Sequence, residues 1–241
     1  MKVVIVGGVA GGATAAARIR RLNEQAEIVV FERSGYISYA NCGLPYYIGG
    51  VIEDPEDLTL QTPESFFSRF RIHMKVHHEV TAIHPDSKTV SVKNLETGEI
   101  FEESYDKLLL SPGAKPVWPN LPGMNSDKLF TLRTVEDTFR IKEFVDQQRP
   151  KSAVMVGGGF IGLEVAENLR ELGMEVTIVQ RPKQLMNPFD ADMASFIHSE
   201  VRKHGVKLAL GYSVEGFAEK NNGVEVLLKD QPSIHADMVV L

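Results

Sequence analysis

The sequence predicts an α/β fold with two Rossmann-like nucleotide-binding units, each a parallel sheet with an antiparallel meander. A glycine-rich turn stands between an apolar strand and a helix at Gly7 to Gly12 and again at Gly157 to Gly162. The two stretches also match one another, because G-G-V-A-G-G-A-T-A-A from Gly7 parallels G-G-G-F-I-G-L-E-V-A from Gly157. An internal repeat of this kind is more informative than either turn alone.

The composition is that of a globular protein and excludes several classes. The 241 residues suffice for one or two domains with a sizeable core, and 43% of them are hydrophobic. A net charge of −6 argues against a general nucleic-acid or anionic-membrane surface. No apolar run reaches the roughly 18 residues that span a bilayer. One cysteine excludes an internal disulfide framework, and we expect a cytoplasmic protein.

The first unit opens with a βαβ pattern. The apolar run from Val3 to Val6 predicts a strand buried on both faces. Ala13 to Leu22 has small residues on one side and arginines on the other, which indicates a helix, and Glu27 to Phe31 is the next strand. A cap residue and a following proline start a helix over Thr62 to Phe70. Further strands are expected at His73 to Ile83, Thr89 to Lys93, Glu99 to Glu103 and Lys107 to Leu110, the first three as a meander.

A stiff connector marked by Pro116, Pro119 and Pro122 indicates the domain boundary. We expect a first domain over 1–116, a connector and helix over 117–150, and a second domain over 151–241. The elements predicted after the connector are a capped helix from Thr134 to Gln148, a strand from Ala153 to Val156, a helix from Leu163 to Leu172, a strand from Glu175 to Val179, a helix from Asp190 to His204 and a last strand from Ala236 to Leu241.

The second turn carries a complete G-x-G-x-x-G pattern at Gly157, Gly159 and Gly162. The first glycine permits a tight turn, the second lets the backbone approach a pyrophosphate, and the third lets helix and strand pack closely. The helix start then presents unpaired N–H groups to the phosphates. We therefore predict a dinucleotide site here rather than a merely structural turn.

The residue at the end of the following strand bears on the choice between NADH and NADPH. Gln180 is neutral, so it does not repel a 2′-phosphate, and Arg181 and Lys183 could pair with one. This charge pattern favours NADPH over NADH. The alternative is that both cations are solvated surface residues.

The first turn departs from the pattern at its middle glycine, where Val9 stands between Gly7 and Gly12. Glu32 follows Gly12 by 20 residues, where a carboxylate can accept ribose hydroxyls. The alternative for Glu32 is a solvated strand end.

Cys42 lies in the stretch S-Y-A-N-C-G-L-P-Y from Ser38 to Tyr46. A lone cysteine is usually an inert, buried packing residue. Here it lies between two nucleotide turns and just before a possible helix from Leu44 to Ile48, whose start would favour the thiolate. A thiolate attacks disulfide sulfur or accepts electrons. With no second cysteine, its oxidised form must be a mixed disulfide, a persulfide or a sulfenic acid.

Other kinds of site find little support. His77 and His78 are neighbours on an expected strand and so point to opposite faces, and no Cys or carboxylate pattern joins them, so no metal site is predicted. No G-x-S-x-G hydrolase motif is present.

Three stretches together resemble the flavin-dependent pyridine nucleotide–disulfide oxidoreductases, which share a glutathione reductase-like fold, and within them the single-cysteine branch that includes coenzyme A disulfide reductase. They are V-G-G-V-A-G-G-A-T at Val6 to Thr14, the cysteine stretch at Ser38 to Tyr46, and E-S-Y-D-K-L-L-L-S-P-G-A at Glu103 to Ala114. The resemblance covers the whole chain.

The resemblance implies Cys42 as catalytic redox nucleophile beside the flavin, and it implies three sets of binding residues. Those expected at FAD are Gly7, Val9, Ala10, Gly11, Gly12, Glu32, Arg33, Asn41, Val80, Ser111, Pro112 and Gly113. Those expected at NADPH or NADH are Gly157, Gly159, Phe160, Ile161, Gly162, Glu164, Gln180 and Arg181. Those expected at coenzyme A are Thr14, Arg18, Arg21, Ser38, Asn41 and Arg71. The two helical arginines could pair with phosphates, or they could form a plain charged helix face.

The implied reaction passes a hydride from NAD(P)H through FAD to a Cys42-linked coenzyme A disulfide or persulfide. The family also implies a homodimer and a chain roughly twice as long, with a second half of the flavin domain and a C-terminal dimer domain. One alternative is an NAD(P)H oxidase or peroxidase that uses a Cys42 sulfenic acid. Those relatives usually carry a histidine in the first turn, where this chain has Ala10. The non-enzymatic alternative is a truncated nucleotide-binding module without turnover.

Overall fold

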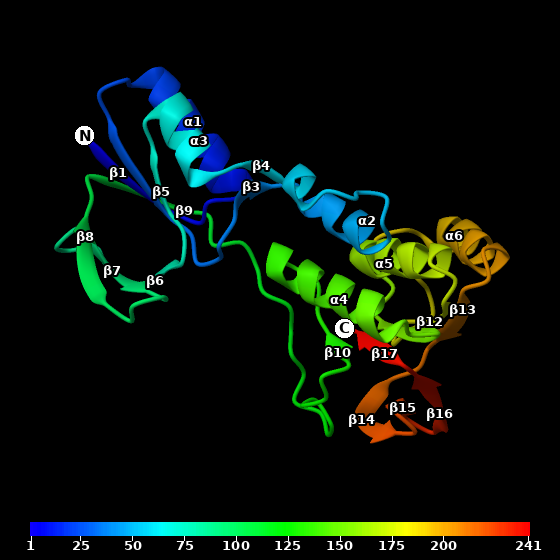
Figure 1. The fold of residues 1–241 in the computed structure, drawn as a ribbon. Coiled ribbons are helices and arrows are strands. Elements are labelled where there is room, and N and C mark those ends of the chain that lie inside the picture. Colours follow the sequence, from blue (N-terminus) through cyan, green and yellow to red (C-terminus); the bar gives the residue numbers. More distant parts are fainter. The chain divides into compact units, whose positions relative to one another are not determined.

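The computed structural model describes residues 1–241, which fold as two compact units (Figure 1). The first unit comprises 1–41 and 55–115, and the second comprises 42–54 and 116–241. The chain thus changes unit after Lys115. The segment 42–54 packs with the second unit instead of the first, and 117–150 is part of the second unit rather than a separate connector. None of the helices has the length and apolar character needed to cross a membrane.

The first unit is built on a four-stranded parallel sheet in the order β5-β2-β1-β9. Its strands are β1 (Lys2–Val6), β2 (Glu27–Phe31), β5 (His73–Lys75) and β9 (Lys107–Leu110). The helices are α1 (Ala10–Leu22) and α3 (Pro63–Phe70), and the antiparallel meander is β6 (His78–His84), β7 (Thr89–Asn94) and β8 (Ile100–Ser104). A small pair, β3 (Ile37–Tyr39) with β4 (Thr59–Gln61), and a short 3-10 turn over Pro55–Leu58 complete the unit.

Alternating side chains of the sheet build two cores. Val3 and Ile5 of β1 pack with the alanines of α1, whereas Val4 between them packs with Val90 and Val92 of the meander. All of these side chains are buried. The unit is therefore three layers deep, with helices on one face of the sheet and the meander on the other (Figure 1). This is why its strands are continuous apolar runs in the sequence.

The second unit repeats this plan with a five-stranded parallel sheet in the order β10-β17-β11-β12-β13. Its strands are β10 (Leu129–Phe130), β11 (Ser152–Val156), β12 (Glu175–Gln180), β13 (Lys207–Leu210) and β17 (Met238–Val240). Its helices are α2 (Leu44–Ile48), α4 (Val135–Gln148), α5 (Phe160–Glu171) and α6 (Ala191–Lys203). Its meander is β14 (Val214–Lys220), β15 (Gly223–Leu228) and β16 (Gln231–Ala236), which shares a core with one face of the sheet.

Both predicted capping signals are confirmed. Thr62 accepts a hydrogen bond from the Ser65 N–H before α3, and Thr134 accepts one from the Asp137 N–H before α4. In each case the N3 side chain bonds back to the N–H of the cap residue, as in a capping box.

Several predicted boundaries are wrong. The expected strand from His73 to Ile83 is two strands, because the chain leaves the parallel sheet after β5 and turns at His77, whose φ is 55°. His77 is therefore not beside His78 on a strand. Helices α1 and α5 begin three residues earlier than expected, inside their turns, and Ala236 ends β16 rather than opening the last strand.

Gly7 is required where β1 meets the strand that returns beside it. Its φ is 96°, and a Cβ there would lie 2.0 Å from the carbonyl oxygen of Ser111. A side chain at this position would push apart two neighbouring strands. Gly12 has a related role, since a Cβ there would lie 1.7 Å from the Gly7 carbonyl oxygen.

We predict that Gly7→Ala lowers the free energy of unfolding by about 3 kcal/mol or more, because it combines backbone strain with a backbone clash. Gly98→Ala is the matched control, since Gly98 also has a positive φ, of 78°, but an added Cβ there would meet no atom within 4 Å. Its cost should be the conformational part alone, about 1 kcal/mol. Urea unfolding of both variants measures the difference, and equal losses would contradict the close approach.

Candidate functional site

The first glycine turn leads directly to a fixed carboxylate. The Gly7 N–H donates to the carbonyl of Phe31 at 2.8 Å, which ties the turn to the end of β2. The Gly8 N–H then donates to Glu32 Oε2 at 2.7 Å, and the Ser34 N–H donates to Oε1 at 2.9 Å. Each carboxylate oxygen keeps a further lone pair for a ligand hydroxyl. Glu32 is thus oriented by the backbone, not a freely solvated strand end.

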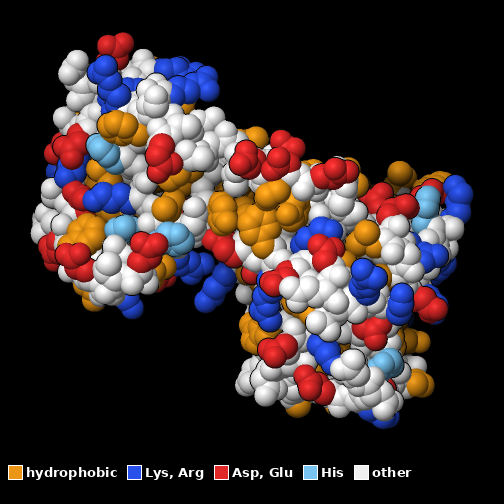
Figure 2. Space-filling view, viewed as in Figure 1, with side chains coloured by type: hydrophobic (Ala, Val, Ile, Leu, Met, Phe, Trp, Pro, Cys, Tyr) orange, Lys and Arg blue, Asp and Glu red, His pale blue; other side chains and the backbone are white.

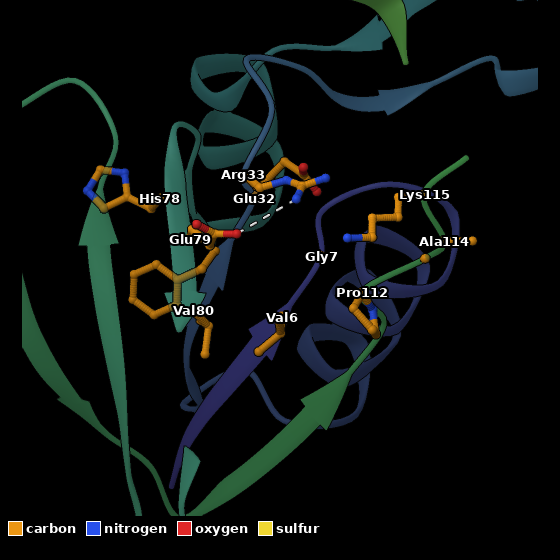
Figure 3. A pocket seen from close by; sticks show the side chains of 12 residues that line it. Val6, Gly7, Glu32, Arg33, His78, Glu79, Val80, Pro112, Ala114 and Lys115 are labelled. Atoms are coloured by element: carbon orange, nitrogen blue, oxygen red, sulfur yellow. Dashed lines mark ion pairs between the residues drawn. The ribbon is translucent and has the colours of Figure 1, made fainter. Parts of the chain in front are cut away.

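A pocket of about 290 Å³ opens beside this carboxylate (Figure 3). The predicted residues that line it are Gly7, Glu32, Arg33, Val80, Pro112 and Gly113, with Ala114 of the same loop. The residues not predicted are Val6, Phe31, His78, Glu79 and Lys115. The pocket therefore gathers the first turn, the end of β2, the start of the meander and the loop after β9.

The meander reaches the pocket through one backbone contact. The His78 N–H donates to the Glu32 carbonyl at 2.9 Å, which brings the start of β6 alongside the end of β2. The Arg33 guanidinium lies 3.7 Å from the Glu79 carboxylate at the rim. The His78 ring packs on Phe31, with 6.2 Å between the ring centroids. His78 and Glu79 follow β5 closely in the sequence, and nothing else in the sequence indicates that they line this pocket.

The predicted coenzyme A residues of α1 share one exposed face. Thr14, Arg18 and Arg21 follow at helical spacing and all three are exposed. Arg71, also exposed, takes the left-handed conformation that ends α3, with a φ of 52°. Ser38 also has a positive φ, of 45°.

Of the predicted residues Ser38 and Asn41, Ser38 contacts the first turn. The Ser38 N–H donates to the Gly8 carbonyl at 3.0 Å. Asn41 has a buried side-chain oxygen, Oδ1, without a hydrogen-bond partner. A buried acceptor of this kind is costly unless a ligand or water supplies a donor. At the start of α1, the Ser111 hydroxyl lies only 2.8 Å from the Cβ position of Gly11.

Cys42 is an exposed free thiol in a 3-10 turn over Asn41–Gly43. The turn continues into α2, as predicted, whose Leu44 and Ile48 are buried. The helix packs on α4 and α5, and Tyr47 meets Phe139 edge-on at 5.5 Å between ring centroids. The interpretation of Cys42 as a buried packing residue is therefore wrong, since its neighbours are anchored while its own side chain is accessible.

The second turn repeats the hydrogen bonds of the first. The Gly157 N–H donates to the Val179 carbonyl at 2.9 Å, and the Gly158 N–H donates to Gln180 Oε1 at 3.0 Å. Gln180 thus occupies the structural position of Glu32 without its charge. A Cβ on Gly159 would meet no atom within 4 Å, so the space before the start of α5 is open. Of the other residues predicted here, Phe160 and Ile161 are exposed and Gly162 packs on the Gly157 carbonyl.

The loop after Gln180 makes a backbone hydrogen bond to the second glycine turn. Arg181 and Lys183 are exposed, whereas Leu185 is fully buried. The Met186 N–H donates to the Gly158 carbonyl at 2.8 Å. The Leu185 N–H donates to Nε2 of His198 on α6 at 3.0 Å. Leu185, Met186 and His198 were not predicted, because nothing local in the sequence links α6 to the turn.

Comparison with known proteins agrees with this geometry. The family model of the pyridine nucleotide-disulphide oxidoreductases matches residues 1–241. The chain belongs to this family. It is 43% identical to the coenzyme A disulfide reductase of Staphylococcus aureus (strain MRSA252) over 239 residues, which is 99% of this chain and 53% of that protein.

Solved structures share the fold. The reduced CoADR-RHD of Bacillus anthracis has a TM-score of 0.95 and 48% identity, and the chain covers 43% of it. A water-forming NADH oxidase from Lactobacillus brevis has a TM-score of 0.93 and 35% identity, with 53% of it covered. An NAD-dependent persulfide reductase from A. fulgidus has a TM-score of 0.94 and 32% identity, with 45% of it covered. Each match covers all of this chain, which spans about half the length of the curated relatives it matches.

The loop after Gln180 is held by a hydrogen bond to the side chain of His198 on α6. Nε2 accepts the Leu185 N–H, so the ring is neutral and a proton on Nε2 would break that bond. Burial of the ring, and then the charge of Arg202, lower the pKa of His198 below its ordinary value.

We predict that the second unit loses stability as the pH falls from about 7.5 to about 5, because the unfolded chain binds the His198 proton at higher pH than the folded chain does. The contribution is complete above the unfolded pKa of about 6.5 and disappears as the pH falls through the lower, folded pKa. His198→Gln keeps an acceptor but does not titrate, so its urea midpoint should vary less over this range. An equal pH dependence in both proteins would exclude His198 as its source.

Proposed function

We propose that the protein containing this chain is an FAD-dependent reductase that uses NADPH to reduce coenzyme A disulfide, or the corresponding persulfide, at Cys42. The observation that carries the proposal is the accessible lone thiol of Cys42 in a chain with two nucleotide turns. The names of the Staphylococcus aureus, Bacillus anthracis and A. fulgidus relatives support the class of substrate. A homodimer and a cytoplasmic location stay predictions.

The residues of the first unit fit the adenosine end of FAD. The Glu32 carboxylate is held by two backbone N–H groups and can still accept ribose hydroxyls in the adjoining pocket. The Gly7 turn and the first turn of α1, which has no side-chain cap, offer N–H groups to a pyrophosphate. When bound, FAD supplies the hydride chemistry that connects a nicotinamide to a sulfur acceptor. The role of this chain there is to bind and orient the cofactor.

The exposed face of α1 fits the polyanionic end of coenzyme A. Arg18 and Arg21 place two guanidinium groups next to Thr14 on one helix face. Phosphate oxygens are the partners that arginine binds most specifically. The orphaned Asn41 Oδ1 would accept a donor from a bound ligand.

Cys42 supplies the covalent step. Its thiolate attacks one sulfur of the disulfide, so that the sulfur–sulfur bond breaks, a Cys42–coenzyme A mixed disulfide forms and one coenzyme A thiolate leaves. Two electrons from NADPH and one proton then return Cys42 to the thiolate state and release the second coenzyme A as a thiol. Overall, one disulfide, one NADPH and one proton yield two thiols and NADP⁺. A second cysteine is unnecessary because the substrate provides the partner sulfur.

The second unit fits NADPH better than NADH. Gln180 fills the position of the ribose carboxylate with a neutral amide, whose Oε1 is already engaged by the Gly158 N–H. A 2′-phosphate therefore meets no negative charge there, and Arg181 and Lys183 are exposed beside it. The open space at Gly159 allows the pyrophosphate to approach the backbone.

We predict that Cys42→Ser abolishes NADPH-dependent reduction of coenzyme A disulfide, because a serine hydroxyl has no sulfur with which to form the mixed disulfide. Reduction of bound flavin by NADPH should continue, which stopped-flow absorbance in the absence of disulfide would show. Unchanged disulfide turnover in the variant would refute the mechanism. Oxygen consumption by the wild type without added disulfide would favour the oxidase alternative, and the absence of any flavin absorbance would favour a nucleotide-binding module.

We predict that Arg181→Ser weakens NADPH binding roughly tenfold, because one charge-assisted contact to the 2′-phosphate is lost. NADH lacks that phosphate and serves as the control ligand, so its dissociation constant should stay within about twofold. Fluorescence titration with each nucleotide measures both constants. Equal weakening for the two nucleotides would place Arg181 outside the phosphate site.

A further inference from the structure

Arg20 does not belong to the exposed basic face of α1, although it lies between two arginines that do. Its guanidinium is part-buried at the end of the helix and donates to backbone carbonyls only. The acceptors are Phe70 at 2.7 Å, Arg71 at 2.9 Å, Ala26 and Glu24 at 2.7 Å each, and Asn23 at 3.4 Å. Arg20 therefore joins the C-terminal ends of α1 and α3, which lie side by side (Figure 1).

An arginine in the second unit makes similar hydrogen bonds to backbone carbonyls, and we call each such arginine with its carbonyl acceptors a clamp. Arg170 stands thirteen residues after Gly157, as Arg20 stands thirteen after Gly7. It donates to the carbonyl of Met174, just before β12, at 2.9 Å, as Arg20 does to the residue just before β2. It also donates to the carbonyl of His204, which ends α6, at 3.1 Å. The clamp is thus a repeated structural element of both units.

The two clamps differ in what they hold. Arg20 bonds the carbonyl of Arg71, an exposed cation in the left-handed conformation. At the corresponding end of α6, Arg170 bonds the carbonyl of His204, and the His204 side chain already pairs with Glu200 at 3.0 Å. Figure 2 shows Lys and Arg side chains gathered over the end of the first unit that carries α1 and α3. Only the first clamp orders a free arginine next to the last turn of a basic helix.

We propose that Arg20 is a positioning residue for the exposed face of α1 that carries Arg18 and Arg21, and that it holds Arg71 so that these three arginines act on one polyphosphate ligand. The proposal rests on the proposed function, with the phosphate end of coenzyme A as the ligand. Arg20 itself has its donors on carbonyl oxygens and does not touch the ligand. It acts by fixing the backbone of Arg71, whose left-handed conformation is otherwise unfavourable for a side-chain residue.

The test compares Arg20→Gln with Arg170→Gln in the flavin-loaded protein. Both variants lose hydrogen bonds to backbone carbonyls, so both should lower the thermal midpoint, and Arg20→Gln should lower it more because Arg20 has five acceptors and Arg170 has two. Only Arg20→Gln should raise the KM for coenzyme A disulfide, roughly tenfold, with kcat and the KM for NADPH within about twofold. Calorimetric titration with coenzyme A provides a second readout without turnover, and its salt dependence should become shallower in Arg20→Gln.

Arg20→Lys provides a milder variant if Arg20→Gln does not fold. As a single substitution, Arg20→Lys should raise the KM for coenzyme A disulfide. Added to Arg71→Gln, it should change that KM no further, because the two residues act through one contact. Additive effects, or equal KM changes in the Arg20 and Arg170 variants, would overturn the proposal. If the wild type saturates with coenzyme A disulfide but the Arg20 and Arg170 variants have the same KM for it, only the role of Arg20 is refuted. A wild type without any dependence on coenzyme A disulfide overturns the proposed function as well.

Discussion

Both nucleotide turns depend on one hydrogen bond, from the second glycine N–H to the side chain that ends the next strand. In the first unit the acceptor is Glu32, and in the second it is Gln180. In the proposed function, the bond connects the turn that would bind phosphate to the strand end that would face a ribose. Because the side chain is already oriented, little conformational entropy remains to be lost when a ligand binds. The geometry is shared by the two units, and the charge of the acceptor is what distinguishes them.

The repeat extends beyond the glycine turns. Each unit adds a meander to its parallel sheet and then returns a final strand, β9 or β17, beside the strand that leads into the glycine turn, β1 or β11. Asp106 and Asp237 precede these final strands and accept the N–H groups of Lys2 and Ser152, at the starts of β1 and β11. The arginine clamps are a further repeated contact. The two units differ in the side chains that this shared plan leaves exposed.

Cys42 shows how a local motif depends on its anchoring. Its stretch places an exposed thiol immediately before a helix whose apolar residues are buried in the second unit. Gly49, just after that helix, lies so close to Asn168 of α5 that a Cβ would be 2.0 Å from its side-chain oxygen. The thiol is accessible, and its backbone is held by packing on α5, the helix that begins at the second nucleotide turn. This arrangement suits a nucleophile that attacks an external sulfur and not one that forms an internal disulfide.

The sequence by itself determined the two Rossmann-like units, both glycine turns, the capped starts of α3 and α4, and the helix after Cys42, because each of these is specified by neighbouring residues. The tertiary structure decided what distant segments bring together. His78 and Glu79 reach the Glu32 pocket only through a meander that begins beside β2, and His198 supports the second turn from a different helix. Arg20, which looked like one more surface cation, is a clamp because α3 ends against α1. Local patterns report backbone preference and burial, whereas the partner of a side chain depends on strand order and register, which no short stretch of sequence contains.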